Sequence, residues 1–297
     1  MTYNIGGGRK NFDAKIDDLI EVVSEIQPDL LGLQEAWESI DGDGYSVLVA
    51  QAMARALGDF QACFGPTISM REDFHIAKKA FIEAIFKDMQ EWQLGNALVS
   101  RWDFLRLGQL ERNGTPVNIP LYRPTSYRGT RDTDPRNVLI TRIGCSPLNP
   151  YVMVTHLTTI LGERRGSIPA LQGKTEEARQ IRWRQAQALL DLIQTHILDQ
   201  GHFAILLGDF NATAGEPCLE NVLERDGRFM RLVPVPQLAT HPKAATPIDH
   251  ILIFPGAWMV ESRCWVVDNP LTRRASDHLP VVADLRITAR NGSPQIG

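Results

Sequence analysis

The amino-acid sequence predicts one α/β domain whose strands pack in two sheets. Short apolar runs typical of buried strands alternate with segments in which apolar residues recur at helical spacing. These runs extend from the first residues to beyond position 280, with no repeat, low-complexity tract or interdomain linker between them. Their number exceeds what one short open sheet needs, so we expect two sheets within a single domain at 1–287.

The elements expected in the first half of the chain end at glycine and proline signals. The first strand ends at three consecutive glycines, and Pro28 ends the helix that follows. In order, these elements are a strand at 1–5, a helix at 16–26, a strand at 29–35, a helix at 46–57 and a helix at 75–92 within a helical insertion at 66–94.

The second half is expected to contain one long helix and most of the strands. The helix at 175–198 opens with Thr175-Glu176-Glu177, which suits a helix N-terminus. A short helix is expected near 216–225, and residues 288–297 have the composition of a frayed tail. The expected strands lie at 95–100, 137–143, 151–157, 203–208, 248–254, 262–267 and 279–287.

Composition limits the class of protein. Hydrophobic residues make up 43% of the 297 residues, enough for a large core, and the formal net charge is -4. This acidic balance argues against a strongly basic nucleic-acid binder, although a local basic patch could exist within the average. The four cysteines are widely separated and form no C-x-x-C pair, so neither a zinc site nor a disulfide-rich scaffold is expected.

The sequence shows neither a membrane span nor a targeting signal. No apolar stretch reaches the length of a transmembrane helix, and the first residues lack the charged and apolar regions of a signal peptide. We therefore expect a cytoplasmic protein, and the sequence leaves its oligomeric state open.

Polar residues gather where the expected strands end. The motif GDFNA at 208–212 follows a buried apolar run, and SDHLP at 276–280 follows far downstream. Burying such groups costs free energy unless they have partners, so packing alone does not explain them, whereas a catalytic rim does. The strand ends with polar candidates are those of Asn4, Glu35, His156, Asp209 with Asn211, Asp249 with His250, and Asp277 with His278.

The chemistry of these side chains predicts a divalent metal ion. Carboxylates together with an amide, and without cysteine, form an oxygen-rich set that suits Mg²⁺ or Mn²⁺ better than a closed zinc site. Magnesium usually keeps several waters and takes one or two carboxylates from the protein. Glu35 is the first candidate for that ligand.

Seven short motifs lie in order along nearly the whole chain, each at an expected strand end. They are TYNI at 2–5, LQE at 33–35, GNALVSR at 95–101, THL at 155–157, GDFN at 208–211, IDHI at 248–251 and SDHLP at 276–280. In this set the chain resembles the endonuclease/exonuclease/phosphatase superfamily, which has the deoxyribonuclease I-like fold. The resemblance implies a four-layer α/β/β/α sandwich in which two mostly antiparallel sheets pack face to face, with the active site at one end.

The resemblance also implies how metal and water are held. Glu35 would be the principal metal ligand, with Asn4 and Asp277 at the metal or its waters. Asp209 would orient or deprotonate the attacking water, or hold a second metal, and Asn211 would hydrogen-bond the phosphoryl oxygens.

Three histidines receive different interpretations. By resemblance, His278 would contact the phosphate and transfer protons while Asp249 orients it, and His156 would donate a proton or stabilise charge from the opposite side. His250 stands where relatives often have an aromatic or arginine residue, and we interpret it as a structural histidine of an apolar strand.

Arginines in two loops are candidates for substrate binding. Arg123, Arg128 and Arg131 fall, together with Arg136, in a Pro- and Gly-containing segment between expected strands. Arg164 follows the strand of His156. Such residues could recognise a phosphate or simply be solvated, and both interpretations stay open.

Taken together, the residues predict a metal-dependent hydrolase that attacks a phosphoester with an activated water. The acidic chain favours a small-molecule or lipid-derived substrate, because binding to DNA is dominated by neutralisation of its phosphates. An alternative is a DNA or RNA endo- or exonuclease that uses the loop arginines. A protein of another class, a catalytically silent binding protein on the same fold, would be expected to lack Glu35, Asp209 or His278, and none of them is missing.

Overall fold

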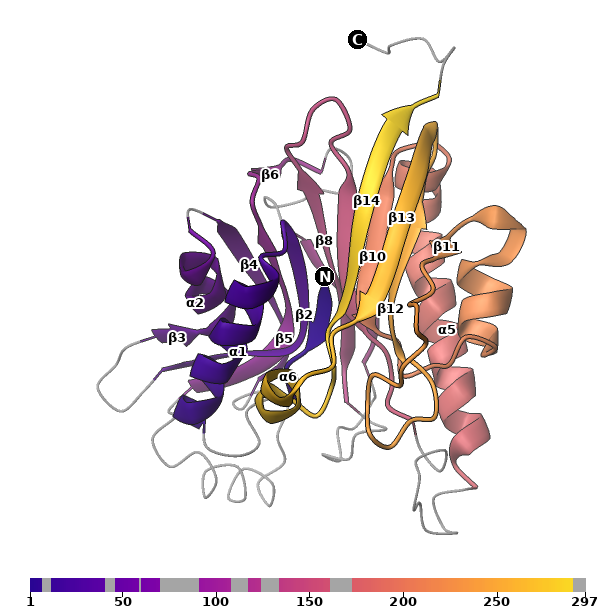
Figure 1. The fold of residues 1–297 in the computed structure, drawn as a ribbon. Helices are drawn as coiled ribbons and strands as arrows, with labels where there is room; N and C mark the ends of the chain where they lie inside the picture. Colours follow the sequence, from indigo (N-terminus) through magenta and orange to yellow (C-terminus); the bar gives the residue numbers. More distant parts are fainter. Residues whose placement is uncertain are drawn as a thin grey trace.

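The computed structural model describes residues 1–6, 12–40, 46–58, 60–69, 91–107, 117–123, 134–160 and 173–290. In these ranges two sheets pack face to face and helices cover their outer faces (Figure 1). The expected four-layer sandwich is therefore confirmed. Both sheets are mixed. In the first, β1 (Thr2–Asn4) runs parallel to β2 (Leu30–Ile40); in the second, β9 (Tyr151–His156) runs parallel to β10 (Ala204–Asp209), while the other neighbours are antiparallel.

Each sheet contains seven described strands. The first has the order β13-β14-β1-β2-β5-β4 with β3 paired to β2, and its further strands are β3 (Ser46–Leu48), β4 (Gln61–Ser69), β5 (Glu91–Ser100), β13 (Trp258–Val266) and β14 (Val281–Ala289). The second has the order β11-β12-β10-β9-β8-β6 with β7 paired to β8, and consists of β6 (Phe104–Leu105), β7 (Val117–Tyr122), β8 (Arg136–Ile143), β9 (Tyr151–His156), β10 (Ala204–Asp209), β11 (Met230–Arg231) and β12 (Asp249–Phe254).

The hydrophobic core has three layers, as a four-layer sandwich requires. Helices α1 (Phe12–Ile26), α2 (Val49–Ala56) and α6 (Pro270–Ala275) pack on the first sheet, where Leu19 and Met53 are fully buried. Helix α5 (Thr175–Ile193), its π-helical continuation Gln194–Leu198 and the π-helical segment Cys218–Leu223 cover the second sheet. Between the sheets lies a third cluster that includes Leu98, Val154 and Leu207.

Several boundaries differ from the sequence-based expectation. The helix expected at 46–57 begins only at Val49, because 46–48 pair with β2 as strand β3. The helical insertion expected at 66–94 is wrong at both ends, since 66–69 belong to β4 and 91–94 to β5; the rest, like most of the helix expected at 75–92, lies outside the described residues. These ends pair with each other, and 91–94 also pair with β2, so both extend the first sheet.

The last strand extends further toward the C-terminus than the sequence predicts. Residues 288 and 289, expected in a frayed tail, belong to β14 and pair with Met259 and Trp258 of β13. The remainder of the expected tail from 291 onward lies outside the described residues. None of the helices in the described ranges is both long and apolar enough to span a membrane.

Candidate active site

Asp209, the last residue of β10, has a polar neighbour on each side in the second sheet. It stands opposite His156 in the parallel pair with β9 and opposite Asp249 in the antiparallel pair with β12. All six residues of β9 and of β10 are buried, which explains why both runs are apolar up to their ends. Strand register therefore brings three side chains that are far apart in the sequence to one edge of the sheet.

The glycine at position 208 of the GDFN motif is required for a steric reason. A Cβ atom at this position would lie 2.4 Å from the carbonyl oxygen of Thr155 in β9, so only glycine fits at this approach. The close contact fixes the spacing of β9 and β10 one residue before Asp209 and His156.

Asn4 links the first sheet to Asp209. It ends β1, and its Nδ2 donates a hydrogen bond to Asp209 Oδ2 at 2.9 Å. The second carboxylate oxygen, Oδ1, accepts a hydrogen bond from the backbone N–H of Asn211 at 2.9 Å. The hydroxyl of Ser276 donates to the carbonyl oxygen of Asn4 at 2.8 Å and so ties the segment that carries His278 to the same place.

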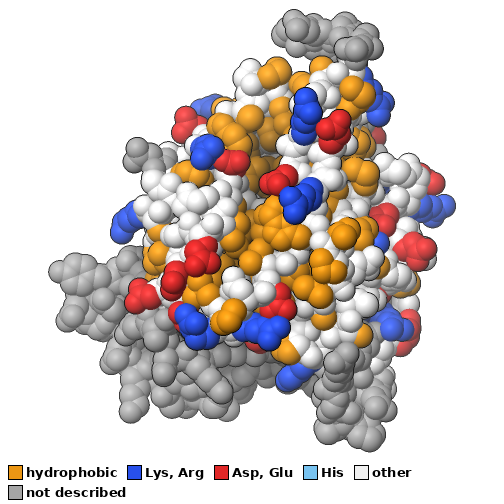
Figure 2. Space-filling view, viewed as in Figure 1, with side chains coloured by type: hydrophobic (Ala, Val, Ile, Leu, Met, Phe, Trp, Pro, Cys, Tyr) orange, Lys and Arg blue, Asp and Glu red, His pale blue; other side chains and the backbone are white. Residues whose placement is uncertain are grey.

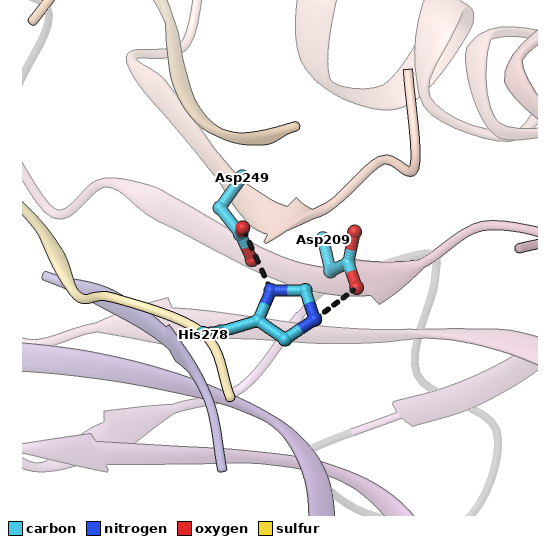
Figure 3. Close-up of side chains that lie close together, drawn as sticks. All are labelled: Asp209, Asp249 and His278. Atoms are coloured by element: carbon cyan, nitrogen blue, oxygen red, sulfur yellow. Dashed lines mark hydrogen bonds and ion pairs between the residues drawn. The ribbon is translucent and has the colours of Figure 1, made fainter. Parts of the chain in front are cut away.

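His278 lies between two carboxylates (Figure 3). Its Nδ1 is 2.9 Å from Asp249 Oδ2, a hydrogen bond in which the ring nitrogen donates, and its Nε2 is 3.7 Å from Asp209 Oδ2. Both carboxylates are buried, with 0% exposure for Asp249 and 1% for Asp209. The pairing of Asp249 with His278 that the resemblance implied is thus present in the geometry.

These contacts raise the pKa values of Asp209 and His278, which favours the neutral form of Asp209 and the charged form of His278. Burial, followed by repulsion from Asp249, raises the pKa of Asp209 to about 7, against the opposing effects of His278, Asn4 and Asn211. Burial alone would lower the pKa of His278, but the carboxylates of Asp249 and Asp209 outweigh it and raise the pKa to about 10. At neutral pH, His278 is therefore an imidazolium, and Asp209 can both take up and release a proton.

The raised pKa of His278 predicts a pH dependence of stability. The imidazole binds its proton more tightly in the folded state, so this contribution is complete below about pH 6.5 and is lost as the pH rises through about 10. In metal-free protein, the difference in free energy of unfolding between wild type and His278→Gln should therefore shrink between pH 6.5 and pH 9.5 in urea titrations. His196→Gln, on the π-helical continuation of α5, serves as the control. An unchanged difference at the two pH values would contradict the assignment.

His156 and Asn211 complete the surroundings of Asp209. The Nε2 of His156 lies 3.3 Å from Asp209 Oδ2. Asn211 adopts a left-handed conformation with φ +49°, and its side-chain amide donates to the carbonyl oxygen of Leu157 at 3.1 Å and accepts from the backbone N–H of Ile160 at 3.3 Å. One hydrogen of the Asn211 amide thus holds the loop after β9. The amide has a second hydrogen, which a phosphoryl oxygen could accept.

Glu35 reaches the site through an irregularity in β2. The register of β2 against β5 shifts between Leu33 and Ala36, and Glu35 within this shift has φ +51°. A bulge redirects a side chain, and a non-glycine residue at positive φ stores strain that often marks a functional position. Glu35 consequently lines the same pocket as Asp209 and His278.

Asp277 does not join this group. Its side chain is 48% exposed, its Oδ2 lies 3.8 Å from Nε2 of His241, and it does not line the pocket. His241 was missed in the sequence, where an isolated Thr-His pair in a loop gives no periodic signal. Its ring packs on that of His278 with 4.8 Å between centroids, and the hydroxyl of Thr240 accepts hydrogen bonds from the N–H groups at 248 and 249.

His250 points away from these residues, as alternation along β12 requires. Its Nε2 is 2.8 Å from the carbonyl oxygen of Ala212, and burial lowers its pKa to about 4. It is therefore neutral at physiological pH, which agrees with a structural histidine.

The arginines that the sequence suggests for substrate binding lie in different places. Arg123 is exposed and does not line the pocket, and Arg128, Arg131 and Arg164 lie outside the described residues. Arg136, at the start of β8, does line the pocket and is 5% exposed.

The pocket lies where the two sheets meet and has a volume of about 60 Å³. Most of the side-chain atoms there that could coordinate a metal ion are oxygens. Asp209, Asp249 and His278 present such atoms within 4.8 Å of one another. Both sheets contribute to its lining, which consists of Glu35, Thr67, Ile68, Leu94, Gly95, Asn96, Asp134, Pro135, Arg136, Asn137, His156, Thr159, Asp209, Asn211 and His278.

Comparison with known proteins gives a family and a fold. The sequence profile of the Endonuclease/Exonuclease/phosphatase family matches residues 1–278, and none of the curated protein sequences matches the chain. Similar solved structures include the human Nocturnin catalytic domain with bound sulfate anion, which is 19% identical with a TM-score of 0.64 over 96% of this chain and 93% of that one.

Two bacterial structures are similar to a comparable degree. An endonuclease/exonuclease/phosphatase from Beutenbergia cavernae is 21% identical, with a TM-score of 0.62 over 96% of this chain and 70% of that one. The mannosyl-6-phosphatase Bt3783 of Bacteroides thetaiotaomicron is 14% identical, with a TM-score of 0.57 over 96% and 98% of the two chains. At these identities the likeness establishes the fold alone.

Proposed function

Since this chain belongs to the endonuclease/exonuclease/phosphatase family, whose members are typically hydrolases, we propose that it is a divalent-metal-dependent phosphoester hydrolase. The proposed substrate is a small-molecule or lipid-derived phosphoester, and the nucleophile is a water molecule. The observation that carries this proposal is the position of Asp209, whose carboxylate receives hydrogen bonds where the two sheets meet and lies beside the Asp249–His278 pair.

The donor set of the pocket fits a hard divalent cation such as Mg²⁺ or Mn²⁺. Glu35 and Asp209 supply carboxylate oxygens, and no cysteine is among the described lining residues. The buried Oδ1 of Asp249 has no hydrogen-bond partner in the described part of the chain, so the site also has an unused acceptor. We assign Glu35 as the principal ligand, with Asn4 beside the ion or its waters. A bound cation would neutralise charge on the phosphoryl oxygens.

Asp209 is the group that we assign to the attacking water. With a pKa raised to about 7, its carboxylate is matched to proton uptake near neutral pH. The hydrogen bonds from Asn4 and from the Asn211 backbone fix the direction of its lone pairs. As the water oxygen bonds to phosphorus, its proton moves to Asp209 and the P–O bond to the leaving group breaks.

Two histidines are assigned to the phosphoryl group and the leaving oxygen. The imidazolium of His278, oriented by Asp249, can donate from Nε2 to a phosphoryl oxygen as negative charge develops there. His156, whose Nε2 lies 3.3 Å from Asp209 Oδ2, would pass a proton to the leaving oxygen. No covalent intermediate with the protein is required by this arrangement.

The choice of substrate rests on charge. The chain carries a formal net charge of -4, and on the face shown in Figure 2 basic and acidic side chains are interspersed, with apolar ones between them. The described residues of this face therefore do not form the basic strip that phosphate neutralisation along a nucleic acid requires. The similar structures include a mannosyl-6-phosphatase and a catalytic domain with bound sulfate, which is compatible with a small phosphoester.

A substrate panel tests the proposal. Bis-p-nitrophenyl phosphate, p-nitrophenyl phosphate, sphingomyelin, and single- and double-stranded DNA and RNA would each be incubated with Mg²⁺, Mn²⁺ or EDTA, beside Asp209→Asn. Hydrolysis restricted to small or lipid esters, requiring metal and abolished in Asp209→Asn, supports the proposal. Cleavage of nucleic acid that is lost in the variant would instead establish the nuclease alternative, and the absence of any variant-sensitive activity would favour a silent binding protein.

Glu35→Gln is expected to weaken metal binding specifically. Removing one ionised ligand while keeping the shape should raise the concentration of Mn²⁺ needed for half-maximal rate by about 10- to 100-fold, with smaller losses at saturating metal. Mn²⁺ binding to Glu35→Gln measured by calorimetry should weaken in parallel. Glu38→Gln, three residues further along β2, is the matched control. Unchanged metal affinity in Glu35→Gln would remove Glu35 from the ligand set.

A further inference from the structure

Arg136 lines the pocket from a stretch of backbone that is anchored to both sheets. It is the first residue of β8, where it pairs with Tyr122 of β7. The carbonyl oxygen of the next residue, Asn137, accepts a hydrogen bond from Asn96 Nδ2 of the first sheet at 3.0 Å, and Asn137 Nδ2 donates to the carbonyl oxygen of Pro66 at 3.1 Å. The backbone that carries the guanidinium is therefore fixed across the gap between the sheets.

The guanidinium of Arg136 is buried with few partners. The residue is 5% exposed, and its Nη2 lies 3.6 Å from Asp134 Oδ2. Its Nε has no hydrogen-bond partner in the ranges that the structure describes. A guanidinium is permanently charged and presents five N–H donors, so a buried one with an unused donor costs free energy that an anion in the pocket would recover.

The charges around the pocket indicate which anion this is. Glu35, Asp134 and Asp209 all line the pocket, and their carboxylates would repel a phosphate. Among the described lining residues, the cations that oppose them are Arg136 and the His278 imidazolium. Repulsion by the carboxylates grows with the charge of the anion, so the permanent charge of Arg136 is needed most by an anion with about two negative charges.

Counting oxygens leads to the same class of substrate. A phosphate monoester presents three non-bridging oxygens and a charge of about −1.5 to −2 at neutral pH, whereas a diester presents two such oxygens and a single charge. In the proposed reaction, a bound cation, the His278 donor and the Asn211 amide would each meet a phosphoryl oxygen, and Arg136 adds a further donor, a set that three oxygens satisfy better than two.

We infer that Arg136 binds a non-bridging oxygen of a terminal phosphate and makes the site selective for phosphate monoesters over diesters. This inference rests on the proposed function of the same site. Arginine suits the role because its planar fork matches phosphate oxygens in two-point contacts, which the point charge of lysine does not reproduce.

Paired model esters test the selectivity. With Mn²⁺ present, wild type should hydrolyse p-nitrophenyl phosphate with a higher kcat/KM than bis-p-nitrophenyl phosphate. Arg136→Met should lower kcat/KM for the monoester by about 100-fold and for the diester by less than about 5-fold, with Arg136→Lys between wild type and Arg136→Met for the monoester. Arg142→Met, in the same strand but opposite the first residue of β9, is the matched control and should change neither rate. Equal losses for the two esters in Arg136→Met would overturn the inference.

A binding measurement separates this inference from the proposed reaction. In EDTA, calorimetric titration with inorganic phosphate should show binding to wild type and at least about 10-fold weaker binding to Arg136→Met, with an unchanged circular dichroism spectrum. Equal affinity for the two proteins, or no binding to wild type, would overturn the role of Arg136 even if metal-dependent hydrolysis occurs. If wild type hydrolyses neither ester, the proposed function fails, while the phosphate titration still decides whether Arg136 binds the anion.

Discussion

His278→Ala is expected to lower kcat by about 10³-fold or more while leaving the protein folded. The substitution removes the donor that faces the developing charge on the phosphoryl group, and positioned electrostatic and proton-transfer groups contribute effects of this size. The fully buried Asp249 would be left without its 2.9 Å partner, so the variant should also show a lower melting temperature. Steady-state kinetics on the preferred ester measures the first effect, and calorimetry or circular dichroism the second.

The partner of His278 provides the control for this result. Asp249→Asn keeps the shape but removes the charge that orients and protonates the ring, and it should lower kcat by about 10²-fold. If Asp249 acts through His278, the double variant should lose little more than His278→Ala alone. Independent, additive losses would contradict the pairing, and a loss of less than about tenfold in His278→Ala would contradict its assigned role.

The second large effect is expected in stability, at a buried ion pair behind the site. Arg182 of α5 has 0% exposure, and its Nη2 lies 2.9 Å from Glu216 Oε2, with Nε on the other carboxylate oxygen. Its Nη1 donates to the carbonyl oxygens of Thr158 and Thr159, in the loop that follows His156. The pair therefore holds this loop against α5.

Arg182→Met should lower the free energy of unfolding by about 3–5 kcal/mol, because it leaves the carboxylate of Glu216 buried without its partner and two carbonyl groups without their donor. Urea unfolding measures this directly. The double variant Arg182→Met/Glu216→Leu should regain part of the loss, since it removes both charges together. A loss of less than about 1 kcal/mol in Arg182→Met would show that the pair contributes little, and Arg179→Met on the same helix controls for the substitution itself.

The elements that the sequence predicts well are the buried strands and their polar ends. The runs before His156 and Asp209 are apolar through Val154 and Leu207 because both faces of β9 and β10 are covered, and such runs are readable without a structure. The polar residue that ends each run is then conspicuous. Which strands lie side by side is a different matter, because Asn4 and Asp209 are separated by 205 residues and meet only through the packing of two sheets.

Other features have no local signature in the sequence. Residues 66–69 and 91–94 fall in the expected helical insertion, yet they pair with each other across the first sheet, and pairing between such distant segments has no local signal. Asp277 and His278 are neighbours in one motif, but they lie in the bend before β14, where the first is exposed and the second lines the pocket. Arg136 was one of several loop arginines in the sequence, and only its burial distinguishes it from Arg123.

The central claim is that the carboxylate of Asp209 activates water on a phosphoester in the presence of a divalent metal ion. The most direct measurement is the initial rate of hydrolysis of the best ester from the panel, for wild type and Asp209→Asn, each with Mn²⁺ and with EDTA. The account predicts turnover by wild type with Mn²⁺, and a rate lower by about 10³-fold in EDTA and in Asp209→Asn. Equal rates for wild type and a folded Asp209→Asn protein would contradict it.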